Sequence, residues 1–350
     1  MLWRHRAGSR APFYAPADVP SAPASSIDRP SSWSTVVAMS MPLFLFLRCG
    51  LLAALLAWAW PAAAADPCPS LRGQTASPSP AVRIAAAACE EHRLWYRPFV
   101  DADGRIAGTR VREAEASPLA NGQVAWQRVV DYWRGSGLLG SAGGSGQCAS
   151  GPSSCRMFVV DTPWSAAFIS WVMRTARIPG FSSSPSHVRY VRQAYRAPQA
   201  SAWRFADPAT TAAAQGDLLC YVRVPSRTFG FDGLGARIAG SDAGLDMHCD
   251  IVVGADTADG HVAYLVGGNV VDGVTMRLLR LAPDGRFEGL PTRAPGDVEC
   301  SPDAQAACNA SRQDWAVLLQ LRPEHELVAL AAPPPGTRVA WAEGARAAAP

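Results

Sequence analysis

Apolar positions follow a helical period in the first half of the chain and a strand period in much of the second half. The pattern predicts helices at 82–95, 122–135, 163–177 and 186–195. On the second of these, one face carries Trp126, Val129, Val130 and Trp133. Strands are predicted at 216–224, 248–254, 261–266, 274–281 and 315–321. Helices followed by an antiparallel meander predict an α+β domain.

Segments without a period divide the chain. The stretch 135–154 is dense in Gly and Ser, and we interpret it as the loop that ends a helical extension over residues 66–154. The main domain follows over 155–330. Residues 1–38 are polar, and we expect either a disordered leader or the product of an upstream start codon. Residues 331–350, rich in Ala and Pro, are expected to form a disordered tail.

Residues 39–65 have the pattern of a signal peptide, with Arg48 as the lone charge before an apolar run over 51–60. Small residues at 63–65 supply a cleavage site. The alternative is an uncleaved membrane anchor, although no cluster of stop-transfer charges follows. We therefore expect a periplasmic or secreted protein, which contacts the membrane only if this segment is retained.

Cysteine usage agrees with export. An even set follows the signal-like segment: Cys68, Cys89, Cys148, Cys155, Cys220, Cys249, Cys300 and Cys308. Cys148 with Cys155, and Cys300 with Cys308, would each close a short loop. Cys220 and Cys249 lie in two predicted strands that could be neighbours. Many pairings are possible for eight cysteines, so sequence alone leaves the connectivity open.

Composition excludes several classes of function. The 350 residues are 49% apolar and 17% charged, which is enough for a sizeable core. A net charge of +3, without a basic run, gives no reason to expect a nucleic-acid partner. All 32 basic residues are arginine, so Schiff-base and P-loop lysines are ruled out.

Three separated segments carry candidate chemistry. Ser165 lies in the first turn of the helix that begins after Pro163. There its hydroxyl would stand beside backbone N–H groups that have no helical acceptor. His248 lies on a predicted strand, and Asn269 follows two glycines that would permit close approach. A nucleophile, a base and a group that orients the base are the parts of a hydrolase triad.

The segments resemble a known group of enzymes. Residues 163–171 (PWSAAFISW) resemble the nucleophile helix of CHAP- and NlpC-type papain-like cell-wall hydrolases, in which Cys stands at the position of Ser165. Residues 216–219, 248–253 and 267–269 resemble the strands that follow it. Over about 155–285 the chain is similar to bacterial domain-of-unknown-function family 2272, which commonly has Ser in this segment.

The resemblance implies a papain-like core, in which the nucleophile helix packs on an antiparallel sheet. It implies cleavage of an amide bond in peptidoglycan, with Ser165 as nucleophile, His248 as base and Asn269 orienting the imidazole. The exchange of Cys for Ser has a chemical consequence. A helix N-terminus converts a thiol into a thiolate but cannot ionise a hydroxyl, so Ser165 would need a base that takes its proton during attack.

Each candidate also has a structural reading. Ser165 could be a small first-turn residue, His248 a hydrogen-bonded strand histidine, and Asn269 a turn residue that tolerates positive φ. Asp250 and Asp272 are substitutes for Asn269 as the third catalytic residue. His187 could line the cleft or cap a helix. Trp164 could floor a glycan groove or belong to the core.

Non-protein groups are not expected. A zinc site from His248, Cys249, Asp250 and Cys220 lacks recognised ligand spacing, so we expect neither metal nor cofactor. The predicted site consists of Ser165, His248 and Asn269, with Trp164, His187, Asp250 and Asp272 contacting substrate. The predicted partner is a peptidoglycan stem peptide or glycan. The alternative function is an inactive relative that binds a wall peptide or a partner protein through the same cleft.

Overall fold

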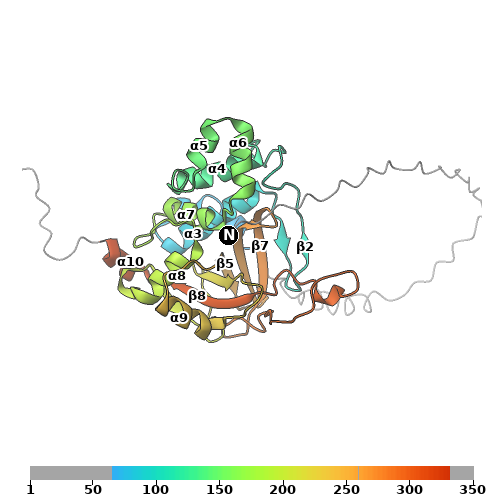
Figure 1. Cartoon of the computed structure of the whole chain (residues 1–350). Coiled ribbons are helices and arrows are strands. Elements are labelled where there is room, and N and C mark those ends of the chain that lie inside the picture. Colours follow the sequence, from blue (N-terminus) through green and yellow to red (C-terminus); the bar gives the residue numbers. More distant parts are fainter. Residues whose placement is uncertain (1–64, 259, 332–350) are drawn as a thin grey trace, which may run out of the picture. The chain divides into compact units, whose positions relative to one another are not determined.

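A computed structural model describes residues 65–258 and 260–331 (Figure 1). The predicted leader, most of the signal-like segment and nearly all of the predicted tail lie outside these residues. Among the described residues, no helix is long and apolar enough to cross a membrane. The predicted α+β class is confirmed, because one large mixed sheet packs against several helices.

The helices of the first half agree closely with the predicted ones. The main α-helices are α3 (Pro80–Leu94), α4 (Ala125–Gly135), α6 (Pro152–Asp161), α7 (Ser165–Thr175), α8 (His187–Arg196) and α9 (Gly230–Gly240). Shorter ones are α2 (Cys68–Leu71), α5 (Gly144–Ala149) and α10 (Glu324–Ala331). Two differences stand out. The Gly/Ser-rich segment forms α5 and part of α6, and α9 forms although it contains several glycines.

Eight strands form the sheet in the order β2-β1-β7-β6-β5-β4-β8-β3. Their bounds are β1 (Phe99–Val100), β2 (Ile106–Ala107), β3 (Trp203–Ala206), β4 (Leu218–Val222), β5 (Met247–Asp256), β6 (Val262–Val270), β7 (Gly273–Arg280) and β8 (Asp314–Leu321). The predicted meander is present as β5-β6-β7, and only β1 pairs in parallel, with β7. Strands β1, β2 and β3 have two to four residues, too few to show a period.

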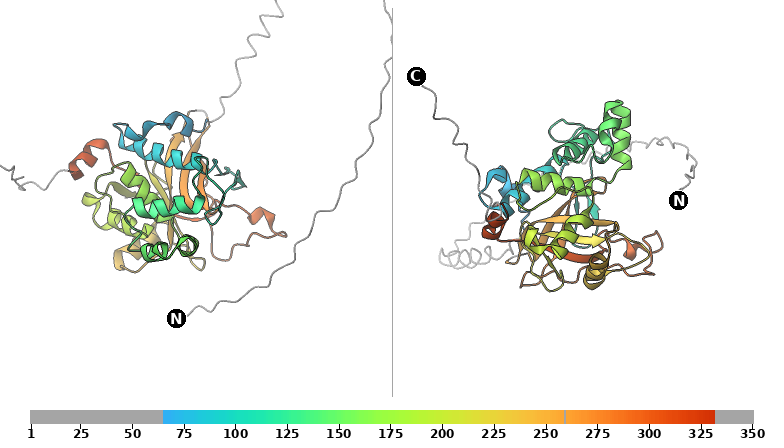
Figure 2. Two further views of the ribbon diagram at one scale, coloured as in Figure 1. Left: turned by 90° about the horizontal axis from the view of Figure 1, so that it is seen from above. Right: turned by 60° about the vertical axis from the view of Figure 1, so that its left-hand side comes forward.

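The sheet separates two apolar clusters. Helices α3 and α7 pack against β5 and β6 (Figures 1 and 2). A large apolar core forms between these helices and the sheet. The second cluster includes Leu219, Tyr221 and Val252 on the strands and Phe287 on the segment after β7. Side chains alternate along β5, so Cys249 and Ile251 belong to the helical core while Val252 belongs to the second cluster.

Helices α4, α5 and α6 lie together beside α7 and form the upper part of the view in Figure 1. Helix α8 lies against β3 and β5, with α9 beside it and against β8. Residues of the extension and of the main domain share one core, for example Ile84 and Phe168. Ser165 on α7, His187 on α8 and Met247 at the start of β5 line one cavity.

Four disulfides join all eight cysteines of the described residues. Three pairs are the expected ones, Cys148–Cys155, Cys300–Cys308 and the cross-strand pair Cys220–Cys249. The fourth, Cys68–Cys89, ties α2 to α3. Disulfides of this number are typical of proteins that fold in an oxidising compartment outside the cytosol.

Candidate functional site

Ser165 is the first residue of α7 and lines a cavity of about 580 Å³. The first bond of the helix runs from the Phe168 N–H to the Trp164 carbonyl at 2.9 Å. Among the described residues, the N–H groups of Ser165, Ala166 and Ala167 have no acceptor. Ser165 is 6% exposed as a residue, and Ala166 lines the same cavity. A negatively charged oxygen in this cavity would meet donors at the helix terminus.

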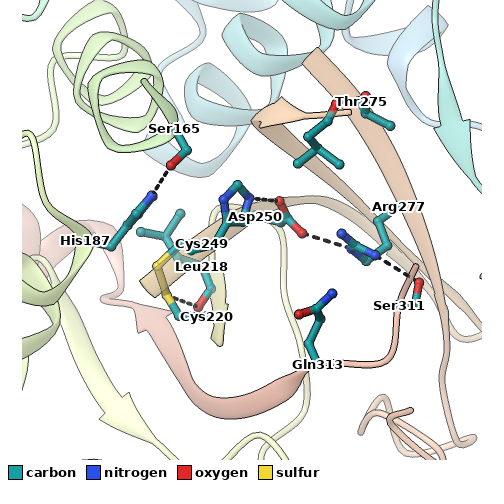
Figure 3. A network of polar contacts seen from close by, with 12 residues as sticks. Ser165, His187, Leu218, Cys220, Cys249, Asp250, Thr275, Arg277, Ser311 and Gln313 are labelled. Carbon is teal, nitrogen blue, oxygen red and sulfur yellow. Dashed lines mark hydrogen bonds and ion pairs between the residues drawn. A yellow bond between two sulfur atoms is a disulfide. The ribbon is translucent and has the colours of Figure 1, made fainter. Parts of the chain in front are cut away.

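The partner of Ser165 is His187, on α8. The Ser165 Oγ lies 2.7 Å from His187 Nε2, and the two side chains point toward each other (Figure 3). The other ring nitrogen, Nδ1, is hydrogen-bonded to the Tyr190 hydroxyl one helical turn further on. Burial, followed by the nearby His248, holds the pKa of His187 well below its usual 6.5. His187 is therefore a neutral imidazole at pH 7, which is the form a general base requires.

A loop fastened to α7 brings His187 to this position. The Ser170 hydroxyl donates to the Ser184 carbonyl and accepts from the Ser184 N–H, each at 3.1 Å. The Ser184 hydroxyl in turn donates to the Ser186 carbonyl at 2.9 Å. Both Ser170 and Ser184 are buried. These bonds fix the start of α8 against α7, so Ser165 and His187 keep a defined separation.

His248 is engaged elsewhere. Its Nε2 lies 2.8 Å from Asp250 Oδ1, on the same face of β5, and both residues are 1% exposed. The ionised carboxylate only accepts, so Nε2 of His248 carries the proton in this contact. His248 shares its strand face with Asp250, opposite Cys249, and its ring centroid is 5.4 Å from that of His187. The histidine that contacts Ser165 is thus His187.

Asp250 joins His248 to a buried arginine. Arg277 Nε donates to Asp250 Oδ2 at 3.1 Å, and Arg277 Nη1 donates to Ser311 Oγ at 3.0 Å (Figure 3). Burial alone would raise the pKa of Asp250, but His248 and Arg277 lower it to about 2. A Cβ at Gly267, on the neighbouring strand, would lie 1.9 Å from Asp250 Oδ1. Glycine at that position therefore makes the room for this ion pair.

The hydrogen-bond partners of Asn269 are Glu113 and Trp164, and not His187 or His248. In the amide orientation that satisfies its neighbours, it donates to Glu113 Oε2 at 3.1 Å and accepts from the Trp164 N–H at 3.2 Å. Its φ is +58°, which fits the reading as a turn residue. The side chain bonded to His248 is thus that of Asp250, one of the two predicted substitutes for Asn269. Asn269 instead holds the start of α7.

The remaining predicted contact residues divide between core and surface. Trp164 has no exposed surface, stacks against the rings of Trp95 and Tyr132, and donates its indole N–H to Glu113. It lies in the core and does not line the Ser165 cavity. Asp272 is exposed on the turn between β6 and β7, where its carbonyl accepts from the Glu113 N–H at 2.7 Å.

Sequence reasoning missed Glu113, Tyr190 and Arg277. A signal existed for Tyr190, because it follows His187 by three residues on a predicted helix and so shares its face. Arg277 stands between Met276 and Leu278 in the middle of a strand, where a charge that becomes buried needs a partner. Nothing local in the sequence connects Glu113 to Trp164, which lies 51 residues further along the chain.

We predict that Glu113 makes the protein less stable as pH rises. Burial raises its pKa to about 7 from 4.5, so the folded state holds a proton that the unfolded state releases. Stability should therefore fall as pH rises from 4.5 through 7. Glu113→Gln should remove about 1–2 kcal/mol of this loss, less than the full pKa shift would give because the carboxyl keeps some solvent contact.

Urea unfolding at about pH 5 and about pH 8 tests this prediction. Burial also raises the pKa of Asp217 to about 7. Asp217 should therefore lower stability with rising pH equally in the wild type and in Glu113→Gln, and it serves as the internal reference. An identical loss of stability in the wild type and in Glu113→Gln would contradict the assignment to Glu113.

The cysteines of the zinc alternative are used in another way. Cys220 and Cys249 form a disulfide, so neither sulfur is a free thiolate ligand. Among the described residues, no group of three or more His, Cys, Asp or Glu side chains has the arrangement of a metal site.

Comparison with known proteins identifies a family. A family model described as an uncharacterized protein conserved in bacteria (DUF2272) matches residues 120–321. No curated protein and no solved structure matches the chain significantly. The matched range runs from just before α4 to the end of β8, and it contains Ser165, His187 and the His248–Asp250–Arg277 network. Since it spans more than half of the chain, the protein belongs to this family of bacterial proteins, DUF2272.

Proposed function

We propose that the protein is an exported hydrolase of the amidase or peptidase type that acts on peptidoglycan stem peptides through Ser165. The observation that carries the proposal is the 2.7 Å contact between Ser165 Oγ and His187 Nε2 at the wall of an open cavity. A nucleophile within hydrogen-bond reach of a neutral imidazole is the first requirement for serine-based acyl transfer.

In the proposed reaction His187 acts as the base. With its own proton on Nδ1, donated to the Tyr190 oxygen, its Nε2 accepts the proton of Ser165 while Oγ attacks the carbonyl carbon. The carbonyl oxygen becomes an oxyanion beside the free N–H groups at the start of α7. His187 then gives its proton to the leaving amine, the C–N bond breaks, and water hydrolyses the acyl-serine by the same route.

A direct contact with the imidazole suits serine chemistry. A cysteine at the same position would be ionised by the helix terminus and would tolerate a looser arrangement. A hydroxyl starts at a much higher pKa, so its proton must move to a base within contact during attack. The bonds from Ser170 to Ser184 supply the rigidity that such a contact needs.

The substrate class rests on compartment and resemblance. The disulfides fit a protein exported to an oxidising compartment, and the segments around Ser165 resemble those of cell-wall hydrolases. A cavity of about 580 Å³ is within the range for small ligands, and a peptide segment fits this size.

One observation favours the alternative, a protein that binds a wall peptide without cleaving it. The group at His187 Nδ1 is the Tyr190 hydroxyl and not a carboxylate, so no negative charge is hydrogen-bonded to that nitrogen when the imidazolium forms during attack. In the opposite tautomer, Tyr190 donates to Nδ1, Nε2 donates to Ser165, and His187 cannot accept the serine proton.

Digestion of purified peptidoglycan separates the two functions. The protein is incubated with intact sacculi, and released fragments are identified by chromatography and mass spectrometry. Hydrolysis predicts soluble fragments with newly freed amino and carboxyl groups. Binding without cleavage predicts that the protein sediments with sacculi and releases nothing, and that result would overturn the hydrolase proposal.

A further inference from the structure

The cavity at Ser165 carries one positive and one negative residue on otherwise mainly apolar or small walls. Arg223 and Asp246 line it together with Ser165 and His187. The remaining lining residues include Trp133, Pro163, Pro185, Leu245 and Met247. Both charged residues are exposed, so their charges are available to a molecule that enters.

Arg223 and Asp246 face each other across two strand ends. Arg223 follows the end of β4, Asp246 precedes the start of β5, and the Arg223 N–H donates to the Asp246 carbonyl at 2.8 Å. Opposite charges at such directly opposed positions commonly pair. Here no ion pair joins them, and neither has a charged partner elsewhere among residues 65–258 and 260–331.

We propose that Arg223 and Asp246 determine the specificity of this cavity by binding the carboxylate and the ammonium group of a zwitterionic peptide. The proposal rests on the proposed function only in that both use the Ser165 cavity. A guanidinium offers paired N–H donors that match a carboxylate, and a carboxylate accepts from an ammonium group. The backbone bond between the two residues holds their main chains together, so both side chains start from the same part of the cavity wall.

Arg223 also links recognition to the base. Burial and then His248 are the main causes that lower the pKa of His187, and the positive charge of Arg223 lowers it further. A ligand carboxylate on Arg223 would offset that charge and make His187 a stronger proton acceptor. A substrate with a free carboxylate would thus bind Arg223 and also strengthen His187 as a base, whereas a neutral substrate would do neither.

The test is binding of alanyl-alanine, measured by isothermal titration calorimetry on the Ser165→Ala protein so that no turnover interferes. Four forms are compared: free, acetylated at the amine, amidated at the carboxyl, and blocked at both ends. Each block should weaken binding roughly tenfold. Arg223→Gln should abolish the effect of amidation only, and Asp246→Asn should abolish the effect of acetylation only.

Arg189→Gln is the matched control, because Arg189 is exposed on α8 and does not line the cavity. Equal binding of all four peptides, no binding of any, or discrimination that survives Arg223→Gln and Asp246→Asn would overturn the proposal. Since the assay needs no catalysis, charge discrimination in a protein that releases nothing from sacculi would support this inference while the hydrolase proposal fails.

Discussion

Ser165→Ala should lower the rate of fragment release from peptidoglycan by roughly 10³-fold or more, since it removes the proposed nucleophile. His187→Ala should cost a similar factor, because the hydroxyl would lose the base that it contacts. The double variant should be hardly slower than either single variant, since the two side chains act as one unit. The measurement is the initial rate of release, followed by mass spectrometry.

Two controls accompany these variants. Ser165→Cys should retain turnover, because the helix N-terminus favours the thiolate. Thermal unfolding should show that Ser165→Ala stays folded, since it removes a single oxygen at a cavity wall. Undiminished release by folded Ser165→Ala would exclude Ser165 as the nucleophile.

The activity should also persist into mildly acidic solution. Burial and the neighbouring His248 hold the pKa of His187 well below 6.5, so the base stays unprotonated as pH falls through 6.5. The rate should be level across that region and fall only at lower pH. A rate that halves at about pH 6.5 would mean that the base is an ordinary, solvent-exposed histidine.

The largest loss of stability is expected from Asp250→Ala. This change leaves Arg277 buried without its carboxylate and leaves His248 without an acceptor. Breaking a buried pair from one side costs about 3–5 kcal/mol. Because the pKa of Asp250 is lowered to about 2, the wild type should keep this stabilisation above 3.8 and lose it as pH falls toward 2.

Urea unfolding at neutral pH measures the effect. Asp103→Ala is the matched control, because it breaks the exposed pair between Asp103 and Arg280. Arg280 lies on β7, the strand that also carries Arg277. That pair is open to solvent and should contribute far less. Equal losses for the two variants would show that the buried network does not stabilise the fold.

Elements with a long, clear period were predictable, and those decided by tertiary contacts were not. The strands β4 to β8 and the helices α3, α4, α7 and α8 carry enough apolar positions to be recognised. Helix α9 has a weak intrinsic preference because of its glycines, and it is stabilised by packing Leu234 and Ile238 into the core. No local pattern distinguishes such a helix from a loop.

The candidate nucleophile could be predicted from the sequence, but the histidine that pairs with it could not. Ser165 was identified by its place after Pro163, whereas the choice between His187 and His248 depends on how the chain folds back after α7. The Ser170–Ser184 bonds make that choice, and they join residues with no recognisable motif. Strand alternation did predict that Asp250 shares a face with His248, and the contact between them follows from it.

The most direct test of the central claim is covalent labelling with a fluorophosphonate, which reacts with serines that a neighbouring base activates. Intact-protein mass spectrometry should show a single adduct, peptide mapping should place it on Ser165, and His187→Ala should prevent it. A folded wild-type protein that stays unlabelled, or carries the adduct on another serine, would contradict the account.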